Sequence, residues 1–269
     1  KLKTNNLELV ADVHGISPDY QPGHAHADSL SFVLYAYGQP FVVDMGISTY
    51  QIGAKRSLER STLAHNTVTI DDKNTAEVWS GFRVGKRPKV KIVASTDNSI
   101  EASLSFEKFE HNRLFNIESN ALTIKDKVNS DKLAVSRLYL HPKVEVNLID
   151  SGKIEFSNGS ILLISNEVEV MVNDYEYNTG YNCQVPAKCL EIKNIEIDVF
   201  TTLPNRYSSF SQEALEVEVN GNVKVERIAI PTHNSGIKDQ SISFKTYFDE
   251  VKSRIKGQHY DLVFASSSR

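Results

Sequence analysis

The sequence predicts an all-β protein, a large antiparallel β-sandwich of stacked sheets with few short helices. Apolar and polar residues alternate with period two along most of the chain, as in Leu30, Phe32, Leu34 and Ala36. The alternating runs are rich in Val, Ile, Phe and Thr, and Asn/Gly/Asp/Ser turns such as SNGS (157–160) join them. Helical periodicity is scarce. Together these features favour sheets packed face to face.

In chain order, the run 30–36 ends at a Gly-Gln-Pro turn (38–40), after which the short apolar run 41–46 continues. Each later run alternates or is β-branched and is bounded by turn residues. The remaining expected strands are 65–71, 90–94, 100–106, 113–118, 121–128, 134–141, 144–149, 153–157, 161–165, 168–172, 195–203, 215–219, 223–230 and 241–248. The best helical window is 245–255, which places Phe248, Val251 and Ile255 on one face.

Composition fits one soluble globular domain over 1–269, because the chain has 40% apolar and 24% charged residues and no Pro/Gly/Ser-rich linker. A net charge of −4 without like-charge blocks gives no support for nucleic-acid binding. The apolar runs are too short to span a membrane. The chain begins at Lys1 without a signal-like segment, so we expect a piece of a longer precursor. Cys183 and Cys189 are near enough in sequence to close a local loop, but we expect free thiols.

The segment GHAHAD (23–28) holds the most concentrated candidate chemistry. On an extended backbone, alternate residues share a face, so His24, His26 and Asp28 could converge on one metal. The pattern His-x-His-x-Asp is similar to that of metallo-β-lactamase-like hydrolases, but Ser29 stands where those enzymes have a histidine. A metallo-hydrolase is therefore one alternative.

A second hypothesis joins distant segments into one zinc site. Asp44 ends the apolar run 41–46, where a carboxylate is costly unless it is paired or binds a metal. His65 stands at the entry to the expected strand 65–71, so His26, Asp44 and His65 could supply two nitrogens and an oxygen. In the alternative, Asp44 caps a turn through Gly46 and His65 is a hydrogen-bonded sheet histidine.

Several motifs, in a specific order, resemble the heparinase II/III-like polysaccharide lyases. They are GHAHAD-LSF, the VD-G-Y strand end, RST-AHNTV and W--FRVG, and they lie within 23–90. The rest of the chain is similar only in being rich in strands. The resemblance implies the C-terminal β-sandwich of an enzyme whose N-terminal α/α toroid is absent from this chain, with acidic polysaccharide cleaved in the cleft between the two domains.

The resemblance also implies residue roles. His24 matches the catalytic or substrate-facing histidine, and His26, Asp44 and His65 match the ligands of one structural, orienting zinc ion. Asp28 then becomes a carboxylate that supports the loop or the zinc ligands without itself binding the metal.

Six further residues are expected near the substrate. Tyr50 follows the VDMG strand end and is a candidate catalytic tyrosine, because β-elimination needs groups that move protons. Arg60, Asn66 and Arg83 are candidate substrate-binding residues, because arginine and asparagine side chains bind carboxylate or sulfate groups. Trp79 and Phe82 could form a platform on which a sugar stacks.

The leading prediction is therefore the β-sandwich portion of a lyase that cleaves uronic-acid-containing polysaccharide by β-elimination, in the periplasm or outside the cell. Such a portion should be inactive or nearly so alone. The expected partners are the acidic polysaccharide and the toroid of the same protein, and an oligomer is possible. The alternative from another class is a non-catalytic carbohydrate-binding or structural module with the same scaffold.

Overall fold

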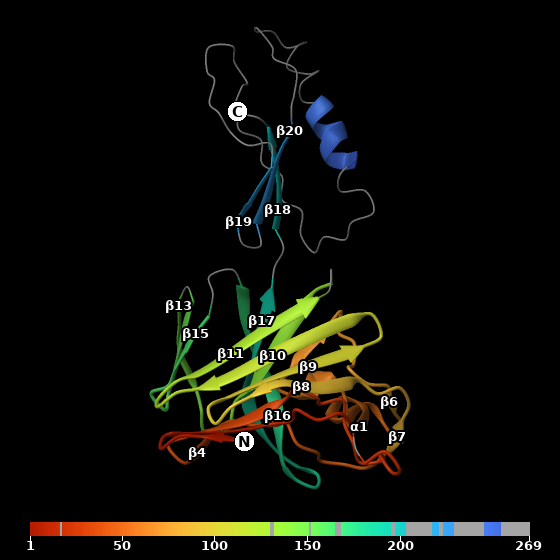
Figure 1. The fold of residues 1–269 in the computed structure, drawn as a ribbon, viewed down its shortest axis with the longest axis vertical. Helices are drawn as coiled ribbons and strands as arrows, with labels where there is room; N and C mark the ends of the chain where they lie inside the picture. Colours follow the sequence, from red (N-terminus) through yellow and green to blue (C-terminus); the bar gives the residue numbers. More distant parts are fainter. Residues whose placement is uncertain are drawn as a thin grey trace. The chain divides into compact units, whose positions relative to one another are not determined.

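The computed structural model describes residues 1–16, 18–129, 132–150, 152–164, 168–194, 197–202, 217–220, 223–228 and 245–253. The chain divides into two compact units, Lys1–Ile195 and Glu196–Arg269, and each is treated by itself. The described parts are mostly strands in several sheets (Figure 1). The predicted all-β, largely antiparallel architecture is confirmed, whereas the prediction of one domain over 1–269 stays a prediction. None of the helices in the described ranges is both long and apolar enough to span a membrane.

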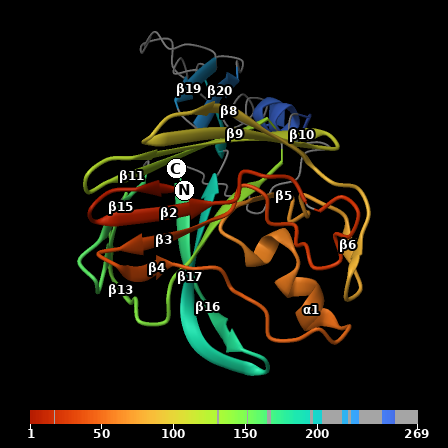
Figure 2. The same cartoon turned by 60° about the horizontal axis from the view of Figure 1, so that its bottom comes forward.

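Two four-stranded antiparallel sheets of the unit Lys1–Ile195 pack on each other. One has the order β1-β2-β3-β4 and contains β1 (Leu2–Lys3), β2 (Leu7–Ala11), β3 (Phe32–Ala36) and β4 (Gln39–Val42). The other has the order β11-β10-β9-β8 and contains β8 (Lys89–Ser95), β9 (Ser99–Phe106), β10 (Phe109–Ile117) and β11 (Leu122–Asn129). Figure 2 shows the second sheet lying as a layer across the first.

The core between these two sheets follows from the alternation. Leu9 and Phe32 from the first sheet pack in one cluster with Phe115 and Ile117 from β10. In β9 and β10 every second residue is buried, so one face of each strand turns inward. Burying a side chain such as Phe115 stabilises the fold by about 1.5–3 kcal/mol. These buried residues define a β-sandwich.

A third antiparallel sheet has the order β16-β17-β12-β5, and a small sheet β13-β14-β15 packs with it. Their bounds are β5 (Val68–Ile70), β12 (Ala134–Tyr139), β13 (Val146–Asp150), β14 (Lys153–Phe156), β15 (Ile161–Leu163), β16 (Val168–Gly180) and β17 (Cys183–Asn194). Short elements complete the unit: α1 (Ala54–Glu59), the 3-10 helix η1 (Thr62–Ala64), and the hairpin of β6 (Val78–Trp79) and β7 (Arg83–Val84).

Strand β17 was not predicted, because Pro186 interrupts its pattern. Proline cannot donate a ladder hydrogen bond and is tolerated where one side of a strand is open. Pro186 pairs with Glu176 of β16, whereas β12 pairs with β17 only from Cys189 to Lys193. The proline therefore lies in the stretch that has a partner on one side only.

The two cysteines lie on this same strand and are free, with Cys183 exposed and Cys189 buried. Six residues of extended strand separate them by roughly 20 Å. A disulfide needs Cα atoms within about 7 Å, so the geometry excludes a local staple between them.

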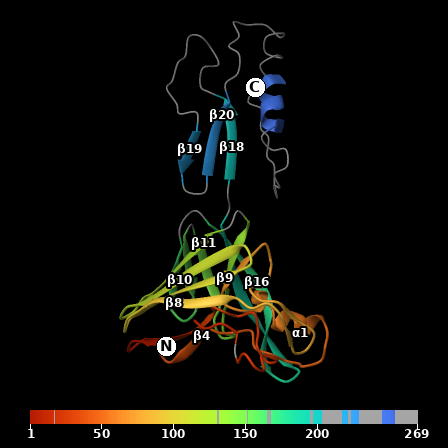
Figure 3. The same cartoon turned by 45° about the vertical axis from the view of Figure 1, so that its right-hand side comes forward.

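The second unit contains β18 (Ile197–Thr202), β19 (Val217–Asn220) and β20 (Val223–Ile228), which Figure 3 shows side by side. Their order is β18-β20-β19, and β18 pairs parallel to β20, which the purely antiparallel prediction did not include. A helix occupies 245–253, in agreement with the helical window, so the predicted strand 241–248 is wrong over 245–248. The first part of that predicted strand, 241–244, lies outside the described residues.

A charged cluster connects β10 with the edge strand β11, and in it Arg113 and His111 are buried while Asp126 is partly exposed. Arg113 donates from Nε and Nη2 to the two carboxylate oxygens of Asp126, at 2.6 and 2.9 Å, and His111 Nε2 lies 2.8 Å from the same carboxylate. Burial opposes ionisation of Asp126, but Arg113 outweighs burial and holds the pKa of Asp126 well below its ordinary value of 3.8. The carboxylate is therefore ionised in the folded protein at neutral pH.

This cluster predicts an acid-dependent stability difference between the wild type and an Asp126→Asn variant. The variant leaves Arg113 buried without its counter-charge, so we expect a loss of about 3–5 kcal/mol at neutral pH. Because the pKa of Asp126 is depressed in the folded state, its contribution is present above about pH 4 and is lost as the pH falls through the folded value. Urea unfolding at a series of pH values measures the unfolding free energies of the two proteins. The difference between them should become smaller only below about pH 4. A difference independent of pH would contradict this account.

Candidate functional site

Segment 23–28 is a loop with turns, not an extended strand, so the expectation that alternate residues share one face does not hold here. Main-chain bonds fix its course: Ala25 N–H donates to Pro22 O, and Ala27 N–H donates to Arg60 O. The hydroxyl of Thr62 donates to Ala27 O at 2.8 Å. The loop is thereby attached to the α1–η1 segment, and its two histidines have different neighbours.

His26 turns toward His65, and their ring centroids lie 5.3 Å apart. Nδ1 of His65 lies 2.6 Å from Oδ2 of Asp44, and since a carboxylate only accepts, this nitrogen carries the proton. Asp44 follows β4, and its Oδ1 accepts the N–H of Gly46 at 2.9 Å. Asp44 therefore caps the turn at Gly46 and pairs with His65 as well, which combines the two alternatives derived from the sequence.

The electrostatics of this cluster separate the two histidines. Burial disfavours the imidazolium of His26, and the nearby His65 and Arg56 add to this, so the pKa of His26 falls to about 3. Burial also opposes charge on His65, but the Asp44 carboxylate outweighs it and raises the pKa of His65. His26 is thus held as the neutral imidazole, the form that binds metals.

The donor types suit zinc, which binds imidazole nitrogen and carboxylate oxygen. Nε2 of His65 is buried and has no hydrogen-bond partner, and leaving such an atom unsatisfied costs about 1–3 kcal/mol. As the side chains stand, no set of three or more histidine, cysteine, aspartate or glutamate residues within the described ranges is arranged to hold a metal ion. The donor types of His26, Asp44 and His65 fit zinc, and the three side chains would have to rearrange before they could bind one ion together.

Asp28 lies close to this cluster as a largely buried carboxyl group. Burial raises the pKa of Asp28 to about 6, and the neighbouring Asp12 adds to the shift while His65 opposes it. The main-chain oxygen of Asp28 accepts the N–H of Ser31 and closes the turn that leads into β3.

His24 faces the other way and is exposed. Its ring meets Tyr50 and Phe82 edge-on, with centroids 5.9 and 5.4 Å away, and these two rings stack on each other. Tyr50 is 41% and Phe82 47% exposed. The structure therefore brings His24 and Tyr50 together on an accessible aromatic surface, which Phe82 completes.

Arg56 of α1 lies between this surface and His26, which is partly buried beside the buried His65. Its guanidinium carbon lies 5.1 Å from the centroid of the Tyr50 ring, and its Nη1 lies 3.5 Å from Nε2 of His26. The side chain is only 1% exposed, and its Nη2 has no hydrogen-bond partner. Cation–π contacts of this kind hold the aromatic rings in place.

Arg60 is buried, and all the hydrogen bonds of its side chain go to main-chain carbonyls. Its guanidinium donates to the carbonyl of Ala25, between the two loop histidines, and to three carbonyls of the β6–β7 hairpin, those of Trp79, Ser80 and Arg83. This placement favours a positioning role over the substrate contact that the sequence analysis predicted for Arg60.

Asn66 is fully buried as well. Its Nδ2 donates to Phe32 O and Val43 O, both at 2.8 Å, and its Oδ1 accepts the N–H of Tyr139 at 2.7 Å. The amide therefore joins β3, the end of β4 and β12, and no edge of it is left for a substrate. Arg83, in contrast, is exposed on β7 opposite Trp79, where a ligand can reach it.

Two buried residues of the site were not singled out from the sequence. Oε1 of Glu59 accepts the N–H and the hydroxyl of Ser48, and Asn178 Nδ2 lies 3.3 Å from it, while Oε2 of Glu59 has no partner. Arg113 reaches the site from β10. For Glu59 the sequence contains no signal, but Arg113 alternates in register with Phe115 and Ile117, and this places it on an inward face.

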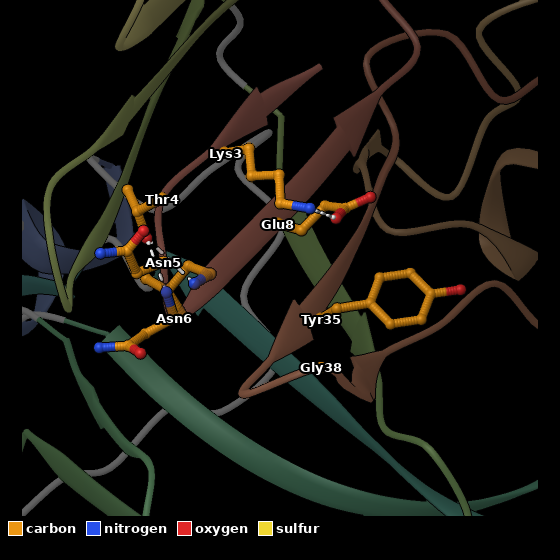
Figure 4. A pocket seen from close by; sticks show the side chains of 8 residues that line it. Lys3, Thr4, Asn5, Asn6, Glu8, Tyr35 and Gly38 are labelled. Atoms are coloured by element: carbon orange, nitrogen blue, oxygen red, sulfur yellow. Dashed lines mark hydrogen bonds and ion pairs between the residues drawn. The ribbon is translucent and has the colours of Figure 1, made fainter.

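A separate hollow of about 280 Å³ lies beside the β1–β2 turn, where Lys3 and Glu8 form an ion pair and Tyr35 lies nearby (Figure 4). Its other lining residues are Thr4, Asn5, Asn6, Leu7 and Gly38. None of them is a candidate site residue, so the candidate site is the loop surface around His24 and not this hollow.

Comparison with known proteins agrees with this fold. A family model described as heparinase II/III-like, C-terminal, matches residues 1–222. A heparinase III structure is 20% identical with a TM-score of 0.51, and the match covers 63% of this chain and 28% of that one. A mutant of heparan sulfate lyase HepC from Pedobacter heparinus is 16% identical with a TM-score of 0.50 and the same coverage. A further heparinase III structure is 16% identical with a TM-score of 0.50, and the match covers 72% of this chain and 35% of that one.

No curated protein matches this sequence. At 16–20% identity the likeness to solved structures concerns the fold alone, and the matched region spans about 28–35% of the length of those chains. The family match is broader, because it covers most of this chain and includes every residue of the candidate site. The chain therefore belongs to the heparinase II/III-like C-terminal domain family.

Proposed function

We propose that this chain is the β-sandwich portion of a polysaccharide lyase that cleaves uronic-acid-containing polysaccharide by β-elimination. In this proposal His24 and Tyr50 act at the substrate, and His26, Asp44 and His65 hold one zinc ion. An N-terminal α/α toroid of the same protein would form the opposite wall of the cleft, and the enzyme would act in the periplasm or outside the cell.

The observation that carries the proposal is the division of the GHAHAD loop. His24 lies on an exposed aromatic surface with Tyr50, whereas His26, two residues later, turns inward to His65 and its partner Asp44. One short loop thus presents a proton-transfer group on one side and is anchored by metal-type donors on the other.

β-Elimination from a uronic acid needs three things: neutralisation of the carboxylate, removal of the C5 proton and protonation of the leaving 4-linked oxygen. A histidine and a tyrosine are suited to the two proton transfers. His24 and Tyr50 lie with ring centroids 5.9 Å apart on the exposed surface, so both can reach one sugar. Which of the two removes the C5 proton is decided by the side of the ring on which the toroid holds the substrate.

The zinc ion, when bound, would supply a structural cross-link between the loops that carry its three ligands. His26 would then be held in one orientation, and the backbone of His24 would be fixed with it. Arg56 also helps to hold Tyr50 and His26 in place, because it contacts the Tyr50 ring and lies beside His26.

Carboxylate binding is only partly supplied by this chain. Arg83 is exposed on the hairpin and can meet an acidic group, with Trp79, 49% exposed, and Phe82 beside it for stacking on a sugar. Arg60 and Asn66 are buried and would act by holding the loops. The remaining carboxylate ligands would come from the toroid, so this chain alone should have little or no lyase activity.

A β-elimination assay on the longest native polypeptide tests the proposal. Sulfated glycosaminoglycan, polyuronate and a neutral polysaccharide would be supplied in turn, and the unsaturated product would be read by its ultraviolet absorbance. We expect product from at least one uronic-acid-containing substrate and none from the neutral control. Binding of an acidic polysaccharide without product would favour the non-catalytic module, and hydrolysis without an unsaturated product would favour the metallo-hydrolase.

A further inference from the structure

A buried arginine outside the motif region, Arg113 of β10, reaches the segments that carry the proposed zinc ligands. Its side chain is 1% exposed, and its guanidinium lies 5.7 Å from the ring centroids of both Phe32 and Phe115. The centroids of these two rings lie 5.5 Å apart, so the guanidinium packs against the ring pair, and in a packed core it has little freedom to change its orientation. Arg113 is therefore a rigid donor at a fixed place.

The charge of Arg113 is balanced by Asp126 of β11 through two hydrogen bonds, from Nε and Nη2. This bidentate pair uses one edge of the guanidinium and leaves Nη1 free for other acceptors. Nη1 donates to the main-chain oxygens of Leu30, at 2.8 Å, and of Asn66, at 2.7 Å. One nitrogen thus joins two segments 36 residues apart in the chain.

Both acceptors occupy special positions. Leu30 ends the loop that begins with GHAHAD, and it has a φ of 65°, a left-handed conformation that costs a non-glycine residue about 1 kcal/mol or more. Its N–H donates to Asp12 O, so with Arg113 both of its main-chain polar groups are held. These two hydrogen bonds hold Leu30 in its strained conformation, and the loop enters β3 directly after it.

Asn66 directly follows His65, and its side chain donates to the oxygen of Val43, the residue before Asp44. A bond to the main-chain oxygen of Asn66 therefore acts on the segments of two proposed ligands at once. Through Leu30 and Asn66, Arg113 connects the loop of His24 and His26 with the segments of Asp44 and His65.

We infer that Arg113, held in place by Asp126, is a positioning residue that sets the relative placement of the three ligand-bearing segments. The inference rests on the proposed function insofar as these segments form a zinc site. It requires no contact between Arg113 and metal or substrate, and its effect passes through the two carbonyl groups.

The test separates positioning from stability by using a paired substitution. In Arg113→Met/Asp126→Leu, both charges are replaced by apolar groups, so no unpaired charge remains in the core. The two bonds to Leu30 O and Asn66 O are lost all the same. Arg113→Lys keeps a charge for Asp126 but cannot reproduce the fixed fork of the guanidinium.

A matched control exists at Arg137 of β12, another buried arginine paired with a carboxylate. It donates to Glu191 at 2.9 Å and to the hydroxyl of Thr69 at 2.6 Å. Within the described ranges, its side chain donates to no carbonyl of the ligand-bearing segments. Arg137→Met/Glu191→Leu therefore removes a comparable pair without touching the site.

Two readouts are measured on the 269-residue chain: zinc affinity by chelator competition, and amide hydrogen exchange of residues 23–31 and 65–67. For Arg113→Met/Asp126→Leu we expect a zinc Kd about 10- to 100-fold higher. Exchange in both segments should be about tenfold faster or more. The Arg137 control should change neither the zinc Kd nor the exchange rates. For Arg113→Lys, both quantities should lie between those of the wild type and those of the Arg113 double variant.

Unchanged zinc affinity and unchanged exchange in the Arg113 double variant would overturn the inference. Equal changes in the control would do so as well, because they would mean general loosening. If the wild type binds no zinc, the zinc part of the proposed function fails, whereas the exchange of the two segments still decides whether Arg113 positions them.

Discussion

Replacing His24 by alanine in the longest native polypeptide should lower the β-elimination rate about 10²- to 10⁴-fold, the usual contribution of a group that transfers a proton. His24 is exposed and takes no part in the contact between His26 and His65, so the variant should keep its zinc and its fold. The rate is measured as unsaturated-product absorbance, and the metal content of the same sample is determined in parallel.

Two other histidines provide the comparison. His26→Ala should lose zinc and activity together, because it removes a proposed ligand. His141 lies two residues after β12 with its ring near Tyr177, and His141→Ala should keep both. Full activity in His24→Ala would remove this residue from the mechanism.

Replacing Arg60 by methionine should destabilise the chain by about 3 kcal/mol or more, because buried carbonyl groups lose their donor. Trp79 is the only tryptophan of the chain, and its own carbonyl accepts from Arg60. Its fluorescence therefore reports directly on the hairpin. We expect more efficient acrylamide quenching of Trp79 in Arg60→Met, since the β6–β7 hairpin is no longer tied to Ala25.

The matched control is Arg83→Met on the same hairpin. Arg83 is exposed, and its side chain makes no hydrogen bond or ion pair with the described part of the chain, so its loss should change the unfolding free energy by less than about 0.5 kcal/mol. Equal stability and equal quenching in the two variants would show that Arg60 does not hold the hairpin.

Alternation predicted most of the sandwich, because each inward strand face repeats every second residue. Ile100, Ala102 and Leu104 are examples, and all three are buried. It failed at β17, where the consequence of Pro186 depends on how far the neighbouring strand β12 extends. It also failed for 23–28, where alternating residue types are carried by turns. Period two in sequence indicates a shared face only if the backbone is extended.

The site residues divide by the kind of information they require. His26, Asp44 and His65 were grouped from donor chemistry, and the structure brings His26 beside His65 and pairs His65 with Asp44. Arg60 was expected at the substrate because arginine binds carboxylate groups. Its residue type says nothing about the hairpin carbonyls that surround it in the fold. Whether an arginine meets a ligand or a main-chain oxygen depends on segments that only folding brings together.

Zinc analysis of the purified 269-residue chain, repeated after chelation and reloading, tests the central claim most directly. We predict one zinc ion per chain in the wild type and loss of that zinc in each of the variants His26→Ala, Asp44→Ala and His65→Ala. His24→Ala should retain it. A wild-type chain that binds no zinc, or three ligand variants that all keep it, would contradict the account, and two metal ions that both depend on Asp28 would support a metallo-hydrolase instead.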